Sequence, residues 1–227
     1  MQIKKVSDVE AGGGSACFQD DVSDGMVLVV DDDTGMQNAL SNLFRSVGLA
    51  VELFESGEDL LARGLPDLPS CIVLDVRLRG DNGLALQTRL GRAGVHVPII
   101  FLSGYGDVRM TAAAMKAGAL NFIAKPFRDQ DLLDAVNEAL QRDRARRRTV
   151  SKEQALHDRF AALTVREQEV MQLLVRGLMN KQVADVLGIS MATVKIYRGQ
   201  AMRKMQARTF ADMVLMAVEL GLCKFES

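Results

Sequence analysis

The sequence predicts a doubly wound α/β domain with a five-stranded parallel sheet, then a long helix, then an all-α domain of four helices. Short apolar runs alternate with helical patterns in the first part, which is typical of buried parallel strands joined by crossover helices. After about residue 128 the sequence shows helical patterns only. Two domains fit within 227 residues.

The apolar runs of the first part place five strands, each followed by a helix. The strands are expected at residues 26–30, 49–54, 71–74, 97–102 and 120–124. The helices are expected near 35–47, from a cap at Ser56, near 83–92, from about Asp107 and from about Arg128. Five such units predict right-handed crossovers and helices on both faces of the sheet.

A long connector helix is expected between the two parts. From Gln130 the helical pattern runs without Pro or Gly to about Phe160. Residues 142–148 (RDRARRR) place five arginines and one aspartate in the middle of this helix. Two interpretations stay open: a solvated face of the connector, or a basic surface that touches DNA phosphate or a dimer partner.

Each helix of the last part begins near a residue that can cap it. Thr164 and Glu167 form the Thr-x-x-Glu pattern of a capping box. Asn180 is expected to cap the second helix and Ser190 the third, after a tight turn at Gly188. The fourth helix is expected over roughly 209–220. The two central helices with their tight turn suggest a helix-turn-helix.

Composition narrows the class of protein. With 48% hydrophobic residues the chain can form packed cores, yet no apolar run approaches the roughly 18–20 residues of a membrane span. No signal-peptide pattern opens the chain. Three cysteines without metal-ligand spacing favour a reduced, cytoplasmic setting with no membrane association. Residues 1–24 are polar and glycine-bearing, and a mobile extension is expected there.

Charge differs between the two parts. Residues 1–127 hold 11 basic and 16 acidic side chains, whereas residues 128–227 hold 17 and 13. An acidic first part and a basic second part favour a small-ligand or metal domain joined to a nucleic-acid-binding domain.

Four of the expected strands end at side chains able to carry phosphoryl chemistry. Residues 31–33 (Asp-Asp-Asp) follow the first strand, and Asp75, Ser103 and Lys125 follow later strands. In parallel sheets ligands gather at the carboxyl ends of the strands. The sequence therefore predicts a phosphoryl and metal site at this edge.

Adjacent carboxylates repel one another and normally hold a divalent cation, here Mg²⁺. Asp32 and Asp75 can supply carboxylates, with Asp31 close by. The Lys125 ammonium and the Ser103 hydroxyl would face the phosphoryl oxygens. The alternative for residues 31–33 alone is that they cap the following helix.

The third helix of the last part is amphipathic. Its expected buried stripe is Val194, Tyr197, Ala201 and Met205. The expected opposite arc holds Lys195, Arg198, Gly199, Met202 and Arg203. A basic arc on a helix that follows a helix and a tight turn fits insertion into a major groove.

These residues carry a resemblance to a known family. VVDDD, LDVRLRGDNG, IIFLSGYGDV and FIAKPF strongly resemble the receiver domain of bacterial two-component response regulators. The segment from LTVREQEV to MRKMQ resembles the LuxR-type helix-turn-helix of the NarL/FixJ class, within it the FixJ/TodT-like regulators. The resemblance covers roughly 25–220. It implies a flavodoxin-like receiver domain at 25–140, a linker helix at 141–162 and a DNA-binding domain at 163–227, after the extension at 1–24.

The resemblance also implies roles for single residues of the receiver domain. They are Asp75 as phosphoacceptor, Asp31 and Asp32 as acidic pocket, the main-chain carbonyl of Arg77 as a further Mg²⁺ ligand, Ser103 as switch hydroxyl, Phe122 as switch aromatic and Lys125 before a cis bond to Pro126. Two positions depart from the family pattern. Arg79 replaces a common proline, and Ser103 replaces the commoner threonine.

By the same resemblance the chain is a transcription regulator, not an enzyme, and activation of target genes is favoured. The implied DNA contacts are Asn180, Lys181, Thr193, Lys195, Arg198, Gly199, Gln200, Arg203 and Lys204. The implied partners are a sensor histidine kinase, promoter DNA, a second copy when phosphorylated, and RNA polymerase.

A phosphatase of the haloacid-dehalogenase type is the alternative from another class. Asp31 and Asp33 would then be its nucleophile and its acid/base. No second acidic pair follows Lys125 on a further strand, and this alternative leaves Asp75 and the helix-turn-helix without a role.

Overall fold

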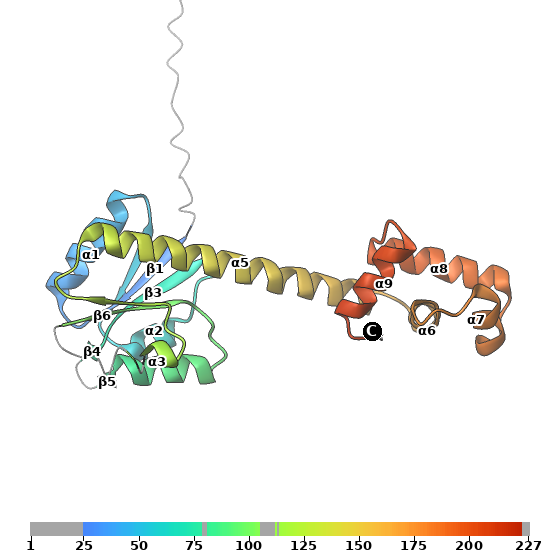
Figure 1. Cartoon of the computed structure of the whole chain (residues 1–227), viewed down its shortest axis with the longest axis horizontal. Helices are drawn as coiled ribbons and strands as arrows, with labels where there is room; N and C mark the ends of the chain where they lie inside the picture. The colour runs from blue at the N-terminus through green and yellow to red at the C-terminus, as the bar shows by residue number, and fades with distance from the viewer. Residues whose placement is uncertain (1–24, 79–80, 105–111, 113, 224–227) are drawn as a thin grey trace, which may run out of the picture.

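A larger α/β domain is joined by one long helix to a smaller helical domain (Figure 1). The computed structural model describes residues 25–223, except 79–80, 105–111 and 113. The predicted extension at 1–24 lies outside the described residues. The described helices include none that is both long enough and apolar enough to cross a membrane.

The first domain is built on a five-stranded parallel sheet, as predicted. Its strands are β1 (Met26–Val30), β2 (Ala50–Phe54), β3 (Ser70–Asp75), β6 (Ile99–Ser103) and β7 (Asn121–Ala124). Their order is β2-β1-β3-β6-β7. The chain thus crosses over between strands and brings the carboxyl ends of β1, β3, β6 and β7 to one edge.

Helices cover both faces of the sheet, so the central strands are apolar on both sides. Helices α1 (Thr34–Ser46) and α5 (Asp129–Ala161) pack on one face around Phe44 and Val136. Helices α2 (Gly57–Arg63) and α3 (Gly83–Arg92) pack on the other. Ser56 caps α2 as predicted, its hydroxyl accepting from the Asp59 amide.

Two parts of this domain differ from the simple alternation of strands and helices. A short antiparallel pair, β4 (Arg77–Leu78) with β5 (Asp81–Asn82), follows Asp75 and was not predicted, because two-residue strands leave no periodicity. The helix predicted from about Asp107 falls largely on residues outside the described part. Residues 112 and 114–116 are helical.

Helix α5 is continuous over 33 residues, about 50 Å at 1.5 Å per residue. The predicted domain boundary at residue 140 therefore falls within one helix. Contacts with the sheet domain continue beyond this boundary. The buried Asp143 carboxylate accepts from the Ser70 amide at 3.0 Å and pairs with Arg146 and Arg147, both at 2.7 Å. Arg147 also donates to the Pro66 carbonyl at 2.9 Å.

Neither interpretation of the arginine run anticipated this contact. Arg147 fastens the connector to the loop before β3, with Asp67 as a further partner at 3.2 Å, whereas Arg146 pairs with Asp143 on α5 itself. The single aspartate among the arginines is the sequence feature that could have predicted this contact. Arginines at i+3 and i+4 on a helix can pair with a carboxylate and so allow its burial.

The second domain has the four helices expected. They are α6 (Val165–Val175), α7 (Asn180–Leu187), α8 (Met191–Met205) and α9 (Phe210–Glu219). The Thr164–Glu167 capping box and the Ser190 cap are confirmed. The Asn180 cap is wrong by one residue: Met179 is the N-cap, and its amide donates to the Gln182 side chain at 2.8 Å.

Candidate functional site

Two carboxylates and one ammonium meet at the carboxyl edge of the sheet. Asp31 follows β1, Asp75 ends β3 and Lys125 follows β7. The Lys125 Nζ donates to Asp75 Oδ2 at 2.6 Å and to Asp31 Oδ2 at 3.1 Å. The predicted gathering of these residues is therefore confirmed by their geometry, because neighbouring parallel strands end side by side.

The electrostatics of the cluster follow from burial and pairing. Burial of Asp31 raises the pKa of its carboxyl, although the Asp33 amide and Lys125 oppose this. Burial alone would lower the pKa of Lys125, but its bonds to Asp75 and Asp31 raise it. One cation thus faces two carboxylates, which leaves the site with a net negative charge that a further cation would neutralise.

Backbone amides fix both carboxylates. The Asp33 amide donates to Asp31 Oδ1 at 2.9 Å, and the Arg77 amide donates to Asp75 Oδ1 at 2.8 Å. The Asp33 side chain caps α1 by accepting from the Gly35 and Met36 amides. The helix-cap alternative therefore holds for Asp33 alone, and not for Asp31.

Two residues that support the site were not predicted from the sequence. Gln37 is buried, and its amide group donates to the carbonyls of Asp31 at 2.6 Å and Phe54 at 3.0 Å. Its spacing to Leu40 and Phe44, which places Gln37 on the apolar face of α1, is the sequence feature that could have identified it. Gly83 lies so close to Asp75 that a Cβ would stand 2.6 Å from the Asp75 carbonyl oxygen.

The predicted switch residues lie on β6 and β7, the two neighbouring strands at one side of the sheet. Ser103 ends β6, is 2% exposed and donates to the Gly104 carbonyl at 3.0 Å. Its own carbonyl accepts from the Lys125 amide at 2.6 Å, and the bond from Lys125 to Pro126 is cis, as expected. Phe122, on β7, packs half-buried against the α2–α3 side of the sheet. Arg79 lies outside the described residues.

The cluster offers oxygen donors to a metal. Asp32 is half-buried beside Asp31, and the Arg77 backbone adjoins Asp75. Within the described part of the chain, no three carboxylate, thiolate or imidazole groups are arranged as a metal site on their own. A metal here would therefore need main-chain carbonyl, water or phosphoryl oxygens as well, which is the coordination that Mg²⁺ favours.

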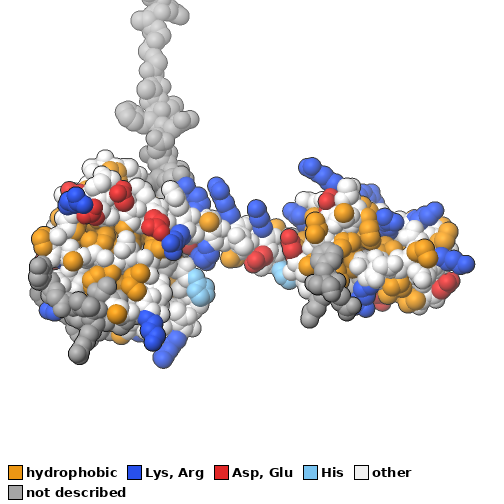
Figure 2. Space-filling model, in the orientation of Figure 1, with side chains coloured by type: hydrophobic (Ala, Val, Ile, Leu, Met, Phe, Trp, Pro, Cys, Tyr) orange, Lys and Arg blue, Asp and Glu red, His pale blue; other side chains and the backbone are white. Residues whose placement is uncertain are grey.

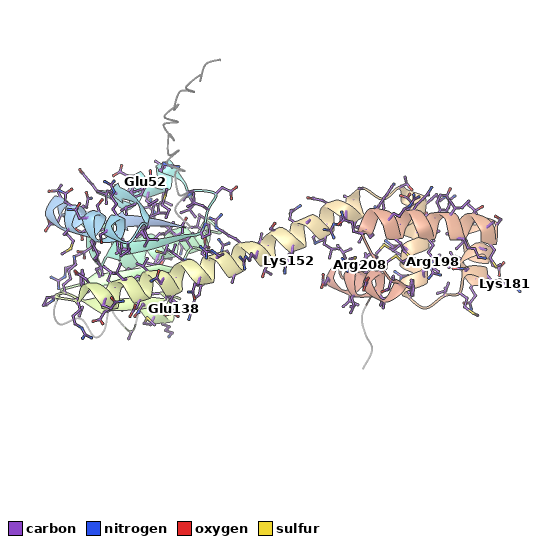
Figure 3. The ribbon with its side chains drawn as sticks, turned by 90° about the horizontal axis from the view of Figure 1, so that it is seen from above. Glu52, Glu138, Lys152, Lys181, Arg198 and Arg208 are labelled. Atoms are coloured by element: carbon purple, nitrogen blue, oxygen red, sulfur yellow. The ribbon has the colours of Figure 1, made fainter. Side chains whose placement is uncertain are left out.

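Helix α8 of the second domain presents a mixed face to solvent. Lys195, Gly199 and Arg203 are exposed, as predicted. Ile196 lies between them and is 58% exposed, an apolar side chain for which no role was predicted. Lys181 lies on α7, at the end of the domain away from the connector (Figure 3).

The expectation that Arg198 and Met202 lie opposite the buried stripe is wrong. The Arg198 guanidinium lies 4.8 Å from the centre of the Phe210 ring, on the side of α8 that meets α9. Met202 is half-buried against the core formed with α9. Helical geometry explains this, because at about 100° per residue Arg198 and Met202 lie roughly 20° and 60° beyond Met205 on the wheel, beside the buried stripe and not opposite it.

The remaining residues that were predicted to contact DNA lie in different environments within the helical domain. Asn180 begins α7, and the Thr193 hydroxyl lies 2.8 Å from that of Ser190. Gln200 is half-buried. The Lys204 ammonium pairs with Glu167 at 2.7 Å and donates to the Ala162 carbonyl at 3.3 Å, so it joins α8 to the start of α6.

Comparison with known families agrees with both halves of this description. Residues 27–137 match the response regulator receiver domain, and residues 161–217 match the luxR family of bacterial regulatory proteins. The two matches coincide with the sheet domain and with the helical domain that contains α8.

Similar whole proteins share both domains. Nodulation protein W of Bradyrhizobium diazoefficiens is 53% identical over 87% of each chain. Response regulator protein TodT of Pseudomonas putida is 41% identical over 83% of each chain. The solved response regulator StyR is 42% identical with a TM-score of 0.81, covering 86% of this chain and 99% of its own. The chain therefore belongs to the response regulators of the NarL/FixJ class, which join a receiver domain to a LuxR-type DNA-binding domain.

Proposed function

We propose that Asp75 is the phosphoacceptor of this response regulator and that a partner histidine kinase supplies the phosphoryl group. The observation that carries the proposal is the pairing of Asp75 with Lys125 at 2.6 Å at the open edge of the sheet. The Asp75 side chain is 14% exposed, whereas that of Asp31 is 2% exposed. A donor molecule can therefore approach Asp75 more readily than Asp31.

The transfer is an in-line displacement at phosphorus. An Asp75 carboxylate oxygen forms the new bond to phosphorus while the bond from phosphorus to the donor's imidazole nitrogen breaks. Lys125 offsets negative charge on the equatorial phosphoryl oxygens. The Arg77 amide holds the other carboxylate oxygen and so fixes the direction of attack.

Mg²⁺ is the proposed cofactor. Asp31, Asp32, Asp75 and the main-chain carbonyl of Arg77 would hold it. When bound, it neutralises the carboxylates and the incoming phosphoryl oxygens. The excess of carboxylate over ammonium in the cluster, and the pKa of Asp31 raised by burial, support this assignment.

Phosphorylation acts, in this proposal, through Ser103 and Phe122. The phosphoryl group adds negative charge and acceptor oxygens that draw the Ser103 hydroxyl toward Asp75. Phe122 then moves inward and changes the face formed by α5 and the helix expected from Asp107, which favours a dimer. The dimer binds paired promoter half-sites through α8 and activates transcription with RNA polymerase, at the chromosome in the cytoplasm. The phosphatase alternative is not supported, because the chain matches the receiver domain and the luxR family over the two halves of its length.

Acetyl phosphate with Mg²⁺ tests the phosphoacceptor directly. The parent chain should gain one acyl phosphate, located by borohydride reduction and mass spectrometry at Asp75. The variant Asp75→Asn should gain none. Asp33→Asn is the matched control, since it removes a carboxylate from the same edge without touching Lys125, and it should still be labelled. Equal labelling of Asp75→Asn and the parent would contradict the assignment.

A further inference from the structure

A groove of about 950 Å³ lies between the loop before β3 and the connector part of α5. Asp67, Leu68 and Pro69 line one side, and α5 residues from Arg144 to Asp158 line the other. The phosphoacceptor site uses none of these residues. Lys152 marks this stretch of the connector in Figure 3, and Figure 2 shows Lys and Arg side chains gathered where α5 leaves the receiver domain.

The groove is positively charged. Four arginines and Lys152 line it, against two aspartates. Arg146 and Arg147 are paired with the buried Asp143. Arg148 and Lys152 are exposed and make no ion pair within the described part of the chain. An anionic ligand would therefore find cations available on the connector side.

The chain enters β1 at the rim of this groove. The Met26 amide donates to the Pro69 carbonyl at 2.9 Å. A Cβ on Gly25 would stand 2.9 Å from the Leu140 side chain and 3.2 Å from the Pro69 oxygen, so residue 25 is held between α5 and the rim. The chain before Gly25 is thus attached at this rim of the groove.

The tethered residues have the complementary charge. Residues 6–24 hold five acidic side chains and no Lys or Arg, with Asp20, Asp21 and Asp24 nearest to Gly25. Five residues span up to roughly 17 Å when extended. From Leu140, beside Gly25, helix α5 rises about 12 Å to Arg148 and about 18 Å to Lys152. The extended segment, together with the lengths of the Asp and Lys side chains, can therefore reach both cations.

We propose that the acidic segment at residues 20–24 is bound in cis by this groove, with its carboxylates facing Arg148, Lys152 and the neighbouring guanidinium groups. Bound in this way, the segment joins the β1 end of the receiver domain to the connector and covers cations that would otherwise attract nucleic-acid phosphate. The cations of this stretch of α5 thus have different roles: Arg147 fastens the helix to the loop before β3, Arg146 pairs with Asp143, and Arg148 and Lys152 bind the segment.

A nitroxide on the native Cys17 tests the contact in the full chain. Cys71 is buried and its pKa is raised to about 12 by burial, so it does not react, and Cys223→Ser removes the other thiol. The label should broaden the amide signals of residues 146–155 at low salt. The combined variant Asp20→Asn, Asp21→Asn, Asp24→Asn should lose this broadening, as should Arg148→Gln with Lys152→Gln.

Asp8→Asn with Glu10→Gln is the matched control, which should keep the broadening. The same broadening in the parent and in the Asp20, Asp21 and Asp24 variant overturns the proposal. So does broadening that arises between spin-labelled and isotope-labelled copies in a mixture, since a second copy would then occupy the groove.

Binding of scrambled DNA gives a second readout that does not depend on phosphorylation. The variant with three asparagines should bind scrambled duplex several-fold more tightly than the parent and with a steeper dependence on salt, because the basic stretch is uncovered. If scrambled DNA instead protects the connector equally in both proteins, the groove belongs to DNA phosphate and the proposal fails.

Discussion

Asp75 and Asp31 both accept a hydrogen bond from Lys125, and nearby backbone groups fix the orientation of both carboxylates. Backbone amides of Asp33 and Arg77 fix one oxygen of each carboxylate. The loop after Asp75 closes through Gly83, whose amide donates to the Val76 carbonyl at 3.1 Å. A residue without a Cβ is needed at this position, because the chain returns to within contact distance of the Asp75 backbone.

Gly83→Ala should disturb the phosphoacceptor loop. Its Cβ would stand 2.6 Å from the Asp75 carbonyl oxygen and 3.1 Å from the Phe101 ring, so the backbone must shift. We expect a loss of about 1–3 kcal/mol in unfolding free energy and slower labelling by acetyl phosphate. Gly91→Ala is the control on the same helix: nothing lies within 4 Å of its Cβ, and about 0.5–1 kcal/mol of stabilisation is expected. Urea unfolding of both variants compares them, and equal stability would refute the steric account.

At the scale of elements, α5 is both a helix of the receiver domain and the connector to the second domain. Asp143, in its middle, binds the connector to the sheet domain. Asp143→Ala should leave the buried Ser70 amide without a partner and release Arg146 and Arg147. We expect a loss of about 1–3 kcal/mol in receiver stability and faster hydrogen exchange at Ser70. Glu138→Ala is the control, because its pair with Arg142 is exposed. Unchanged exchange at Ser70 would show that the contact is not needed.

The same carboxylate gives a dependence on pH. Burial alone would raise the pKa of Asp143, but the bonds from Arg147, Arg146 and the Ser70 amide lower it overall. A folded pKa below the unfolded value, near pH 4, gives stability that is present above that pH and is lost as the pH falls through the folded pKa. Asp143→Asn should lack this part of the acid loss when unfolding is followed from about pH 6 to about pH 2.

Helix α8 carries an exposed cation, Lys195, and a cation that packs within the domain, Arg198. Lys195→Ala should cost about 1–3 kcal/mol of specific binding without loss of stability, because the side chain is exposed. Arg198→Ala should lower the stability of the helical domain by about 0.5–2 kcal/mol through its contact with Phe210. A double-mutant cycle with Phe210→Leu measures that contact, and full additivity would mean that it contributes nothing.

At the scale of the whole molecule, the two domains are joined by one unbroken helix, so a change on the receiver face can alter how two copies present α8. Sedimentation with and without acetyl phosphate should show a dimer only for the phosphorylated parent. Ser103→Ala should accept phosphate but dimerise weakly, since it lacks the hydroxyl that the proposed switch requires. Ser46→Ala, at the end of α1, is the control and should dimerise like the parent. Undiminished dimerisation of Ser103→Ala would remove Ser103 from the switch.

The sequence by itself determined the strands, most helices, their order and the site at the carboxyl edge. These follow from local periodicity and from the rule that parallel strands end together. Asp31, Asp75 and Lys125 could therefore be grouped from their positions in the chain. The same reasoning placed Lys195 on an exposed arc of α8, and its role in DNA binding stays a prediction.

Only the tertiary structure decided which charges are used within the fold. Arg198 contacts Phe210, Lys204 pairs with Glu167, and Arg147 reaches Asp67. Each partner comes from another element or another turn, and a charge pattern does not record that distance. Gln37 and Gly83 support the site for the same reason, because their contacts with Asp31 and Asp75 exist only once the helices pack on the sheet.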